Sequence, residues 1–563
     1  MAIDRWVPGV RAVRTYQPSW LRPDLIAGLV LAAILVPQGM AYAELAGLPP
    51  VTGLYTTIGC LVGYAIFGPS RVLVLGPDSS VSPLIFAAII PLAAVGDPAT
   101  AIALAGMLAL IVGLIEIGLG IGKLGFVADL LSSEVQVGYM NGLAITIIVG
   151  QLPKLFGFST DAEGFFDELR LFVQGLDETK AAALVVGVGV LVILLGLPRL
   201  TRAIPAVLVA VVAATVVSAV LGLAAQIATV GTLPQGFPTP SLPFTDLSHI
   251  LPLLIAAVGI TLVSLTDTIA TSSAFAARRG DEVDPNQEMI GIGAANIAAG
   301  LVQGFAVSTS GSRTAVAESS GAKSQLTGIV GAGVVLVLLL FLNGLLADLP
   351  QSALAGIVIA AALSLLDLAA LRRFWPVRPT EVVLSIIASL GVILLGVLQG
   401  ILIAIVLAVL LFFRRSWWPH GVVLGEVDDL PGWHSLEAYP DARQVDGILV
   451  YRWEAPLFFA NAGAFRRQIR SHIRERPVRW VVVQCEAITD VDITAAGMLE
   501  QLDTELNAKG IHMAFVELRS RLQVLVQQYG LLETLDRDHF YPSVKKALKA
   551  IREEEAAGSS DES

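Results

Sequence analysis

The chain has 563 residues, of which 55% are hydrophobic and 15% are charged, and its formal net charge is −11. Such an apolar, charge-poor composition excludes an ordinary soluble protein, and the acidic balance excludes nucleic acid as a partner, because a phosphate backbone requires clustered Lys and Arg. Most of the chain is therefore expected to lie in a lipid bilayer.

Charged residues are distributed unevenly along the chain. Residues 414–563 hold 41 of the 83 Asp, Glu, Lys and Arg residues, whereas residues 203–245 hold none. No cleaved signal peptide is expected, because no compact apolar core with a small-residue cleavage site stands at the N-terminus. The expected domains are a cytoplasmic N-terminal segment over residues 1–23, a transmembrane transport domain over 24–413, a linker over 414–436, a soluble α/β domain over 437–552 and a disordered tail over 553–563.

Apolar segments follow one another through the first 413 residues. They lie at residues 25–46, 51–68, 79–95, 100–121, 126–150, 181–198, 203–223, 249–275, 289–303, 312–319, 327–346, 352–370 and 382–413. The last segment has 32 residues, too many for one span and too few for two full spans. We expect Gly396 and Gly400 to separate two short helices there that turn back within the bilayer, which gives about 14 membrane elements in a polytopic α-helical protein.

Lys and Arg residues fall in alternate loops, which the positive-inside rule assigns to the cytoplasm. The even number of elements then places both termini in the cytoplasm. The connection over residues 222–250 has no Lys or Arg, as an outer loop should, whereas residues 151–180 fit the rule less well. The cytoplasmic positions are Arg5, Arg11, Arg14, Arg22, Arg71, Lys123, Arg199, Arg202, Arg278, Arg279, Arg372, Arg373, Arg378, Arg414 and Arg415.

The outer loop divides the membrane domain into two halves of seven elements, and an odd number per half inverts the second half relative to the first. Each half contains two polar interruptions at a similar interval: Gln38 precedes Asp78 by 40 residues, and Asp267 precedes Ser310 by 43. Broken helices at corresponding positions of inverted repeats mark a binding site, because unpaired backbone groups can there meet a solute.

The interruption in the second half, residues 308–314, consists of five hydroxyl residues, one Gly and Arg313. A helix that begins here presents free N–H groups and the positive end of its dipole to the membrane interior, where an oxyanion is the natural ligand. Arg313 adds a full positive charge. It either contacts the anion directly or pairs with Glu318 or Asp267 as a structural contact.

The interruption in the first half, residues 76–80, reads Gly-Pro-Asp-Ser-Ser. Pro77 suits the first turn of a helix, and Asp78 or Ser79 suits its N-cap. Each interruption alone could be a capped helix at the membrane surface. Their matched spacing favours two helix starts that face each other and form one anion pocket, and Asp78 is also a candidate proton carrier.

Asp267 lies well inside an apolar segment, where a carboxylate without a partner is costly and is functional by default. Thr271 follows four residues later on the same helix face, so the two can hold a cation together, or Asp267 can take up and release a proton. A permanent pair with Arg313 is the structural alternative. In the first span, Pro37 and Gly39 are expected to kink or unwind the helix, so that Gln38 and Tyr42 point inward.

The soluble part alternates strand and helix patterns, which predicts a small α/β domain. The expected strands cover residues 447–453, 478–483 and 511–518, and the expected helices cover residues 462–473, 494–509 and 520–529.

Over nearly its whole length the chain resembles the sulfate permease family. The resemblance rests on Pro-Gln-Gly-Met-Ala-Tyr-Ala at residues 37–43, Leu-Pro-Pro-Val-Thr-Gly-Leu-Tyr at 48–55, Phe-Gly-Pro-Ser-Arg at 67–71 and Ser-Gly-Ser-Arg-Thr at 310–314. It implies a core and a gate built from seven plus seven inverted spans, a homodimer, and a cytoplasmic C-terminal α/β domain similar to anti-sigma-factor antagonists, the STAS domain.

The resemblance also implies roles for individual residues. It places in the anion site Gln38, Tyr42, Ser79, Ser80, Thr309, Ser310, Gly311, Ser312 and Arg313. Asp267 and Thr271 match the acid and hydroxyl that hold sodium in bicarbonate-carrying relatives, where other members keep an acid for protons. Residues 309–311 are Thr, Ser and Gly, a more polar set than the bicarbonate-type pattern, which weakens the case for sodium.

The sequence thus predicts a secondary active transporter of a small oxyanion in the cell membrane, and sulfate coupled to a proton through elevator movement is the preferred reading. A runner-up is sodium-coupled bicarbonate or dicarboxylate uptake, and a different class is an uncoupled anion channel. An enzyme is not expected, because the sequence shows no catalytic triad or metal cluster, and no cofactor is expected beyond a coupling proton or sodium ion.

Overall fold

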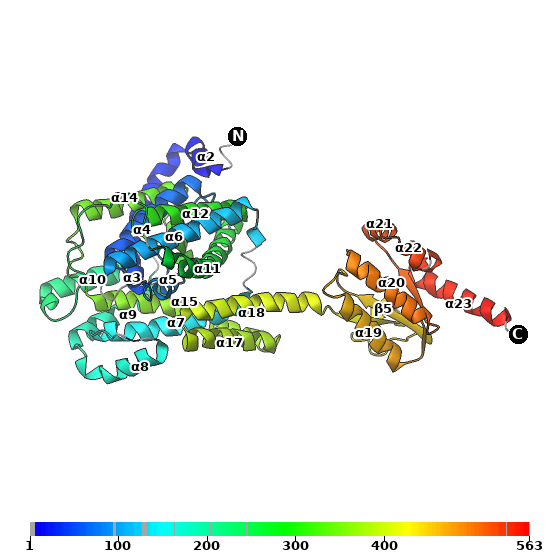
Figure 1. Ribbon diagram of the computed structural model, residues 1–563. Helices are drawn as coiled ribbons and strands as arrows, with labels where there is room; N and C mark the ends of the chain where they lie inside the picture. Colours follow the sequence, from blue (N-terminus) through cyan, green and yellow to red (C-terminus); the bar gives the residue numbers. More distant parts are fainter. Residues whose placement is uncertain are drawn as a thin grey trace. The chain divides into compact units, whose positions relative to one another are not determined.

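The computed structural model describes residues 6–93, 97–126, 132–160, 162, 164–201, 205–243, 246–428, 430–535 and 537–561. The chain divides into two compact units, Met1–Val409 and Leu410–Ser563 (Figure 1). Each unit is described by itself.

The first unit is helical, and its longer helices follow the apolar segments of the sequence (Figure 1). The first half contains α3 (Leu21–Leu45), α4 (Pro50–Phe67), α5 (Ser82–Ile89), α6 (Pro98–Ile121), α7 (Ser133–Phe156), α9 (Ala181–Leu200) and α10 (Ala206–Leu221). The second half contains α11 (Ile250–Ala277), α12 (Pro285–Leu301), α13 (Gly311–Ser319), α14 (Leu326–Phe341), α15 (Gln351–Leu365), α17 (Pro379–Leu395) and α18 (Val397–Trp417). Shorter helices are α2 (Pro8–Arg14), α8 (Phe165–Gln174) and α16 (Leu368–Phe374).

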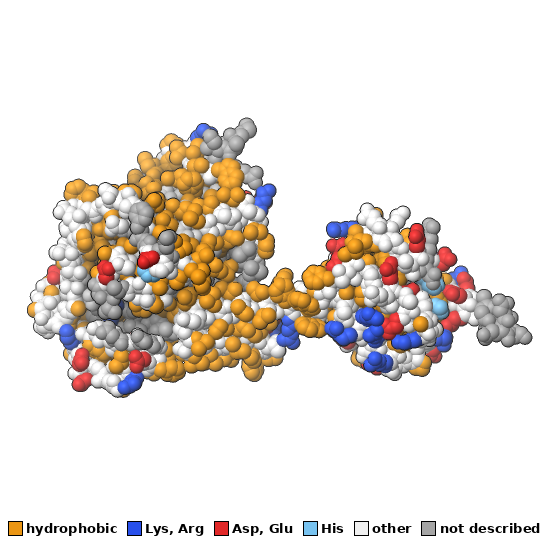
Figure 2. Space-filling view, in the orientation of Figure 1, with side chains coloured by type: hydrophobic (Ala, Val, Ile, Leu, Met, Phe, Trp, Pro, Cys, Tyr) orange, Lys and Arg blue, Asp and Glu red, His pale blue; other side chains and the backbone are white. Residues whose placement is uncertain are grey.

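These helices have the lengths and surfaces of membrane spans. Within the described part of the chain, 8 helices are long and apolar enough to cross a bilayer, and the apolar helices α10, α14 and α17 are shorter. Side chains such as Val185 and Val220 are mostly exposed, and hydrophobic side chains dominate the visible face of this unit in Figure 2. The predicted polytopic helical fold with seven elements in each half is confirmed.

Helix contacts repeat when the two halves are exchanged. Helix α14 packs on α3, and α11 packs on α6 in the corresponding way. Likewise, α17 packs on α7, and α15 packs on α9. This correspondence is what an inverted repeat requires. The contacts α14–α3 and α11–α6 join helices of the group that contains the short elements α5 and α13. The contacts α17–α7 and α15–α9 join helices of the other group.

Glycines allow α6 and α12 to pack closely. A Cβ atom on Gly113 would lie 2.6 Å from the carbonyl oxygen of Gly293, and one on Gly293 would lie 2.7 Å from the carbonyl oxygen of Gly113. Gly106 and Gly300, one heptad away on each helix, meet in the same manner. Small residues are the usual means by which membrane helices approach, because van der Waals packing replaces the hydrophobic effect there.

Two short strands connect the halves. Strand β1 (Leu75–Gly76) pairs antiparallel with β2 (Ser308–Thr309), in the register Leu75 with Thr309 and Gly76 with Ser308. All four residues are buried. Helix α13 begins two residues after β2, and α5 begins six residues after β1, so the pairing of the strands brings the two polar interruptions together.

The break in the last apolar segment lies at one of the two predicted glycines. Gly396 separates α17 from α18 and has a φ of +100°, a conformation that suits glycine. Gly400 is instead inside α18, where an added Cβ would lie 2.5 Å from the Cα of Val392. Its role is close packing between the two helices, and α18, with 21 residues, is not a short helix.

The second unit is an α/β domain with one sheet. Its strands are β3 (Gly421–Glu426), β4 (Trp433–Ser435), β5 (Gly447–Trp453), β6 (Val478–Gln484), β7 (His512–Val516) and β8 (Phe540–Tyr541), in the order β4-β3-β5-β6-β7-β8. Its helices are α19 (Ala462–Glu475), α20 (Ile493–Asn507), α21 (Ser520–Gln528), α22 (Leu531–Thr534) and α23 (Val544–Asp561). The predicted strands and helices of this domain are present.

Two regions of this unit differ from the sequence-based expectation. Residues 414–436, expected to be a linker, include β3 and β4, because the alternating side chains of β3 are buried when it pairs with β5. Helix α23 runs to Asp561, whereas a disordered tail is expected from residue 553. The sequence Glu-Glu-Glu-Ala-Ala at residues 553–557 consists of good helix formers, and residues 562–563 lie outside the described part of the chain.

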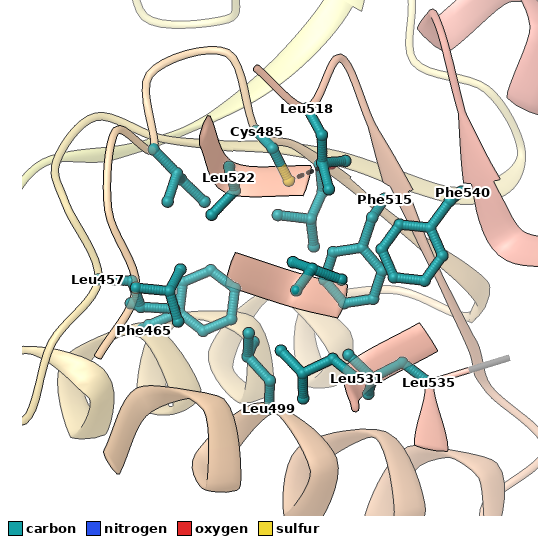
Figure 3. A pocket seen from close by; sticks show the side chains of 14 residues that line it. Leu457, Phe465, Cys485, Leu499, Phe515, Leu518, Leu522, Leu531, Leu535 and Phe540 are labelled. Carbon is teal, nitrogen blue, oxygen red and sulfur yellow. Dashed lines mark hydrogen bonds between the residues drawn. The ribbon is translucent and has the colours of Figure 1, made fainter. Parts of the chain in front are cut away.

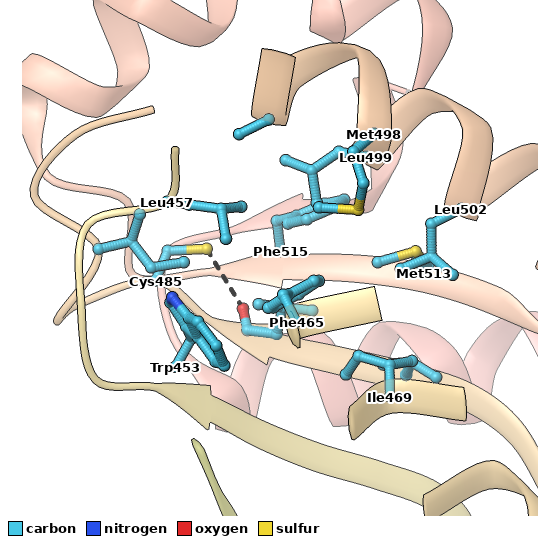
Figure 4. Close-up of a cluster of buried hydrophobic side chains, with 14 of the residues drawn as sticks. Trp453, Leu457, Phe465, Ile469, Cys485, Met498, Leu499, Leu502, Met513 and Phe515 are labelled. Atoms are coloured by element: carbon cyan, nitrogen blue, oxygen red, sulfur yellow. Dashed lines mark hydrogen bonds between the residues drawn. The ribbon is translucent and has the colours of Figure 1, made fainter. Parts of the chain in front are cut away.

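The core of the second unit lies on both faces of the sheet. Trp453, Phe465 and Leu499 belong to the larger cluster, beneath α19 and α20 (Figure 4). Val482 and Ile551 belong to the smaller cluster, beneath α23. The larger cluster encloses a cavity of about 20 Å³ with wholly apolar lining residues (Figure 3). A cavity that small and apolar provides no partners for a polar ligand.

Candidate functional site

The start of α13 is fixed by its neighbours in the sheet and by its own cap. The backbone N–H of Ser310 donates to the carbonyl oxygen of Val74 (3.1 Å), and the N–H of Val74 donates to Thr314 Oγ1 (3.1 Å). Ser310 is the N-cap, and its Oγ accepts from the N–H of Arg313 at 3.4 Å. Gly311 and Ser312 are exposed, and no neighbouring atom lies within 4 Å of a Cβ built on Gly311. The start of α13 is therefore open at Gly311 and Ser312, whereas the N–H of Arg313 is bonded to the cap.

Thr309 and Ser312 complete this segment. Thr309 Oγ1 lies 2.6 Å from Thr268 Oγ1 on α11, so the strand is tied to that helix. Ser312 Oγ lies 3.1 Å from the hydroxyl of Ser310. The hydroxyl groups thus shape the entrance to the helix, and the positive end of the helix dipole lies among them.

The start of α5 differs in detail from the prediction. The helix begins at Ser82, and the proline in its first turn is Pro83 and not Pro77. Asp78 does not cap the helix: its Oδ1 accepts from the N–H (3.1 Å) and the hydroxyl (3.0 Å) of Ser80. An Asp side chain that bonds the backbone two residues later stabilises a turn, so residues 78–81 form a turn before the helix.

Arg313 is the most deeply buried cation of the site, with 1% of its surface exposed. Its Nη2 lies 3.5 Å from Asp78 Oδ2. The three guanidinium nitrogens have no hydrogen-bond partner among the described residues. A buried polar group without partners is costly, so this side chain has donors available for a ligand.

The alternative partners considered for Arg313 are wrong. Glu318 pairs with Arg279 at 2.9 Å and with Arg278 at 3.8 Å. Asp267 contacts other groups, described below. The glycine at position 76 provides room for the guanidinium, because a Cβ there would lie 2.9 Å from Arg313 Nη1.

Asp267 lies near the turn before α5 and near a helix of the other group. Its Oδ1 accepts from Gln136 Nε2 of α7 at 3.3 Å, and the Ser80 hydroxyl lies within hydrogen-bonding range of the same carboxylate. Asp267 is only partly buried. Thr271, one turn further along α11, is partly buried too. No cationic side chain contacts Asp267 among the described residues.

Tyr42 approaches the same place from α3. It is buried, its hydroxyl lies within hydrogen-bonding range of Ser79, and it lies close to both Asp78 and Arg313. Gln38 lies one turn earlier on the helix and is partly buried.

Helix α3 is continuous through Pro37, so the expected unwinding in this span is wrong. Gly39 instead serves packing: a Cβ on Gly53 of α4 would lie 1.9 Å from its carbonyl oxygen. The two helices therefore touch backbone to backbone, and this close contact stabilises the uninterrupted helix.

Two residues of α7 that were not predicted from the sequence border the site. Gln136 contacts Asp267, and Tyr139 is close enough to interact electrostatically with both Asp267 and Asp78. The signal was present, because these two residues lie three positions apart on one face of an apolar helix. Polar side chains on one face of a membrane helix indicate contact with protein or with a cavity.

The comparisons with known proteins cover this whole region. Residues 21–388 match the sulfate permease family, and residues 439–547 match the STAS domain. Over 550 residues the chain is 42% identical to a probable sulfate transporter of Mycobacterium tuberculosis, which covers 97% of this chain and 98% of the relative.

Solved structures agree in fold. SLC26A9 has a TM-score of 0.89 and 23% identity, over 98% of this chain and 93% of that one. The transmembrane domain of a cyanobacterial bicarbonate transporter, BicA, has a TM-score of 0.62 and 25% identity, over 69% of this chain and 98% of that one. Every candidate site residue lies inside the matched membrane region.

Proposed function

The chain belongs to the sulfate permease family, and on this premise we propose that it carries a small oxyanion, sulfate in the first instance, across the cell membrane. The 42% identical relative is described as a probable sulfate transporter, which supports this choice of anion. The proposed binding site lies between the turn before α5 and the start of α13.

The main support for the proposal is the environment of the Arg313 side chain. Its guanidinium is buried, its only ionic contact is the 3.5 Å approach to Asp78, and its donors have no hydrogen-bond partner among the described residues. An oxyanion at the start of α13 would accept hydrogen bonds from this guanidinium and from the N–H groups of Gly311 and Ser312. The hydroxyl groups of Ser310 and Ser312 are placed to add further bonds.

We propose a proton as the coupling ion and Asp267 as its carrier. Asp267 accepts a hydrogen bond from the side-chain amide of Gln136, and the hydroxyl of Ser80, whose hydrogen goes to Asp78, lies close to the same carboxylate. A proton needs only the carboxylate itself. A sodium ion needs several oxygen ligands around it, whereas the hydrogen bond recorded for Asp267 comes from the amide nitrogen of Gln136.

The proposed movement is of the elevator type. The helices that hold the site, α3 to α6 and α11 to α14, would move against α7, α9, α10, α15, α17 and α18. The hydrogen bond between Asp267 and Gln136 joins the two groups. This hydrogen bond breaks when Asp267 moves relative to α7. The bond therefore links the protonation state of Asp267 to the position of the helices that hold the site.

Two further features are part of the proposal. The loops rich in Lys and Arg and the STAS domain are placed on the cytoplasmic side together with both termini, which follows the positive-inside rule. A homodimer is expected from the family resemblance. Accessibility of single cysteines introduced at residue 240, in the outer loop, and at residue 282 tests the orientation.

A second candidate is sodium-coupled bicarbonate transport, which the similarity to the BicA transmembrane domain favours. Uptake of labelled sulfate, bicarbonate and fumarate into proteoliposomes, under an imposed proton or sodium gradient, separates the candidates. The proposal expects sulfate uptake that an inward proton gradient accelerates. Bicarbonate uptake that requires sodium would overturn it in favour of the second candidate.

A further inference from the structure

A second acidic side chain lies within the helices that hold the site, at a place that the proposed function does not use. Glu116 lies near the C-terminal end of α6, and its exposed fraction is 0%. Its carboxyl group meets α11 and α12 behind β2, at Ser264 and Asn296. Neither contact is charged. An ionised carboxylate in a membrane interior without a cation partner is costly.

The contacts of Glu116 form a closed network around one residue of the chain, Val307. Asn296 Nδ2 donates to Glu116 Oε2 at 2.7 Å, and the N–H of Val307 donates to Asn296 Oδ1 at 2.8 Å. Ser264 Oγ lies 3.0 Å from Glu116 Oε1 and 3.2 Å from the carbonyl oxygen of Val307. Both backbone polar groups of Val307 are therefore held by this network.

The number of hydrogens that the network can supply determines whether Glu116 is protonated. The Ser264 hydroxyl has one hydrogen, yet it lies within bonding distance of two acceptors. The carbonyl oxygen of Val307 can only accept. When Ser264 donates to Val307, the bond to Glu116 requires a hydrogen on the carboxyl group. A protonated Glu116 thus satisfies every member of the network, whereas an ionised one leaves a buried acceptor without a donor.

Asp24 provides the contrast within the same unit. This buried carboxylate accepts five hydrogen bonds, which come from the N–H groups of Lys323 and Ser324 and from the hydroxyls of Ser324, Thr327 and Tyr16. Such a set of donors suits an acceptor-only group. Glu116 has one certain donor, the amide of Asn296, and its environment suits a neutral acid.

The network fixes the strand that leads into the anion site. Val307 directly precedes β2, and Ser310, the N-cap of α13, follows three residues after it. The first N–H groups of α13 and the guanidinium of Arg313 take their positions from this strand. Small displacements of such donors lower affinity, because hydrogen bonds depend steeply on geometry.

We propose that Glu116 is a permanently protonated positioning residue, which holds β2 through Ser264 and Asn296 so that α13 presents its donors to the anion. The assignment of its effect to anion binding rests on the proposed function. It gives Glu116 a task different from that of Asp267, because Glu116 keeps its proton throughout the transport cycle.

Glutamine tests this state directly, because its amide can donate to Ser264 and accept from Asn296 as the neutral acid does. In the full-length protein in proteoliposomes, Glu116→Gln is expected to keep the KM for sulfate within about twofold and to keep its response to a proton gradient. Glu116→Leu and Ser264→Ala are expected to raise KM about tenfold, the effect of losing about one buried hydrogen bond. Ser272→Ala is the matched control, because Ser272 is a buried serine of the same helix whose hydroxyl donates to the carbonyl oxygen of Ile269 in that helix.

Two results would overturn the proposal: loss of proton coupling in Glu116→Gln, or an unchanged KM in both Glu116→Leu and Ser264→Ala. Infrared difference spectra of wild type and Glu116→Gln give a readout independent of transport. We expect the C=O band of a protonated carboxyl group in the wild type from about pH 5 to about pH 7, and carboxylate bands in its place would contradict the assignment. If the wild type carries another anion instead of sulfate, the proposed function fails, whereas the spectra and the KM values for that anion still decide the role of Glu116.

Discussion

Arg313 of α13 and Asp78 before α5 form an ion pair across the two halves of the membrane unit, with 3.5 Å between Nη2 and Oδ2. Each residue follows one strand of the β1–β2 pair, so strand pairing brings them together. An anion bound at the start of α13, as proposed, would compete with Asp78 for the same guanidinium. The pair would then stabilise the empty site and limit the affinity of the filled one, which would help release of the anion.

Removal of the Arg313 charge is expected to weaken anion binding. Arg313→Gln leaves Asp78 without its cation and removes the buried positive charge, so the KM for sulfate uptake should rise tenfold or more, by about 1.5–3 kcal/mol for a charged hydrogen bond. Concentration-dependent uptake into proteoliposomes measures this. Arg199→Gln is the control, because Arg199 is exposed at the end of α9, and equal effects of both substitutions would refute a role of Arg313 in binding.

Neutralisation of Asp267 is expected to abolish the dependence of transport on the proton gradient. Asp267→Asn keeps the size of the side chain and the contact with Gln136, but it removes the proton-binding group. Uptake in this variant should no longer respond to an imposed proton gradient, and Asp281→Asn, at an exposed position after α11, should respond normally. The uncoupled channel would be favoured if Asp267→Asn kept full flux and if uptake by the wild type also did not depend on the proton gradient.

The α6–α12 contact is expected to tolerate no added side chain. Gly113→Val places a Cβ only 2.6 Å from the carbonyl oxygen of Gly293, and overpacking of this kind costs about 1–3 kcal/mol. Thermal unfolding in detergent should show a lowered midpoint. Gly118→Val on the same helix is the control, because no atom lies within 4 Å of a Cβ at Gly118, and similar midpoints for the two variants would contradict the packing argument.

The general plan of the membrane unit could be predicted from the sequence. A bilayer forces the backbone into helices, so the lengths of the apolar segments predicted the number of membrane elements. The matched polar interruptions indicated that residues 75–80 and 307–314 meet, and the pairing of Leu75 with Thr309 confirms that they do.

Finer features of the site depend on packing between distant segments and could not be predicted. The partner of Arg313 is Asp78 and not Glu318, because β1 and β2 set their distance and Glu318 is occupied by Arg279. The start of α5 at Ser82 depends on the turn that Asp78 makes with Ser80. The contact of α7 with Asp267 arises from tertiary structure alone.

Glu505 of the soluble unit gives a prediction for acidic pH. Arg470, Arg466 and Lys509 bind its carboxylate and lower its pKa to about 2. The pKa in the unfolded chain is about 4.3, so the ionised form stabilises the fold above that value. This contribution is lost as the pH falls from about 4 toward about 2.

Hydrogen exchange of α19 and α20 peptides in the full-length protein measures this contribution. Glu505→Gln should exchange faster than the wild type at pH values above about 5, and the difference should vanish toward about pH 2. Glu500→Gln is the control on the same helix, because Glu500 accepts from Thr534 and contacts no arginine in the described structure. A difference that grows at low pH would contradict the assignment.

The central claim is that an oxyanion binds between the turn before α5 and the start of α13. Anomalous diffraction from crystals grown with selenate, which has the shape and charge of sulfate, tests it most directly. The account predicts one selenium peak within hydrogen-bonding reach of the Arg313 guanidinium and of the N–H groups of Gly311 and Ser312. Selenium bound away from both helix starts, in a protein that takes up selenate in proteoliposomes, would contradict it.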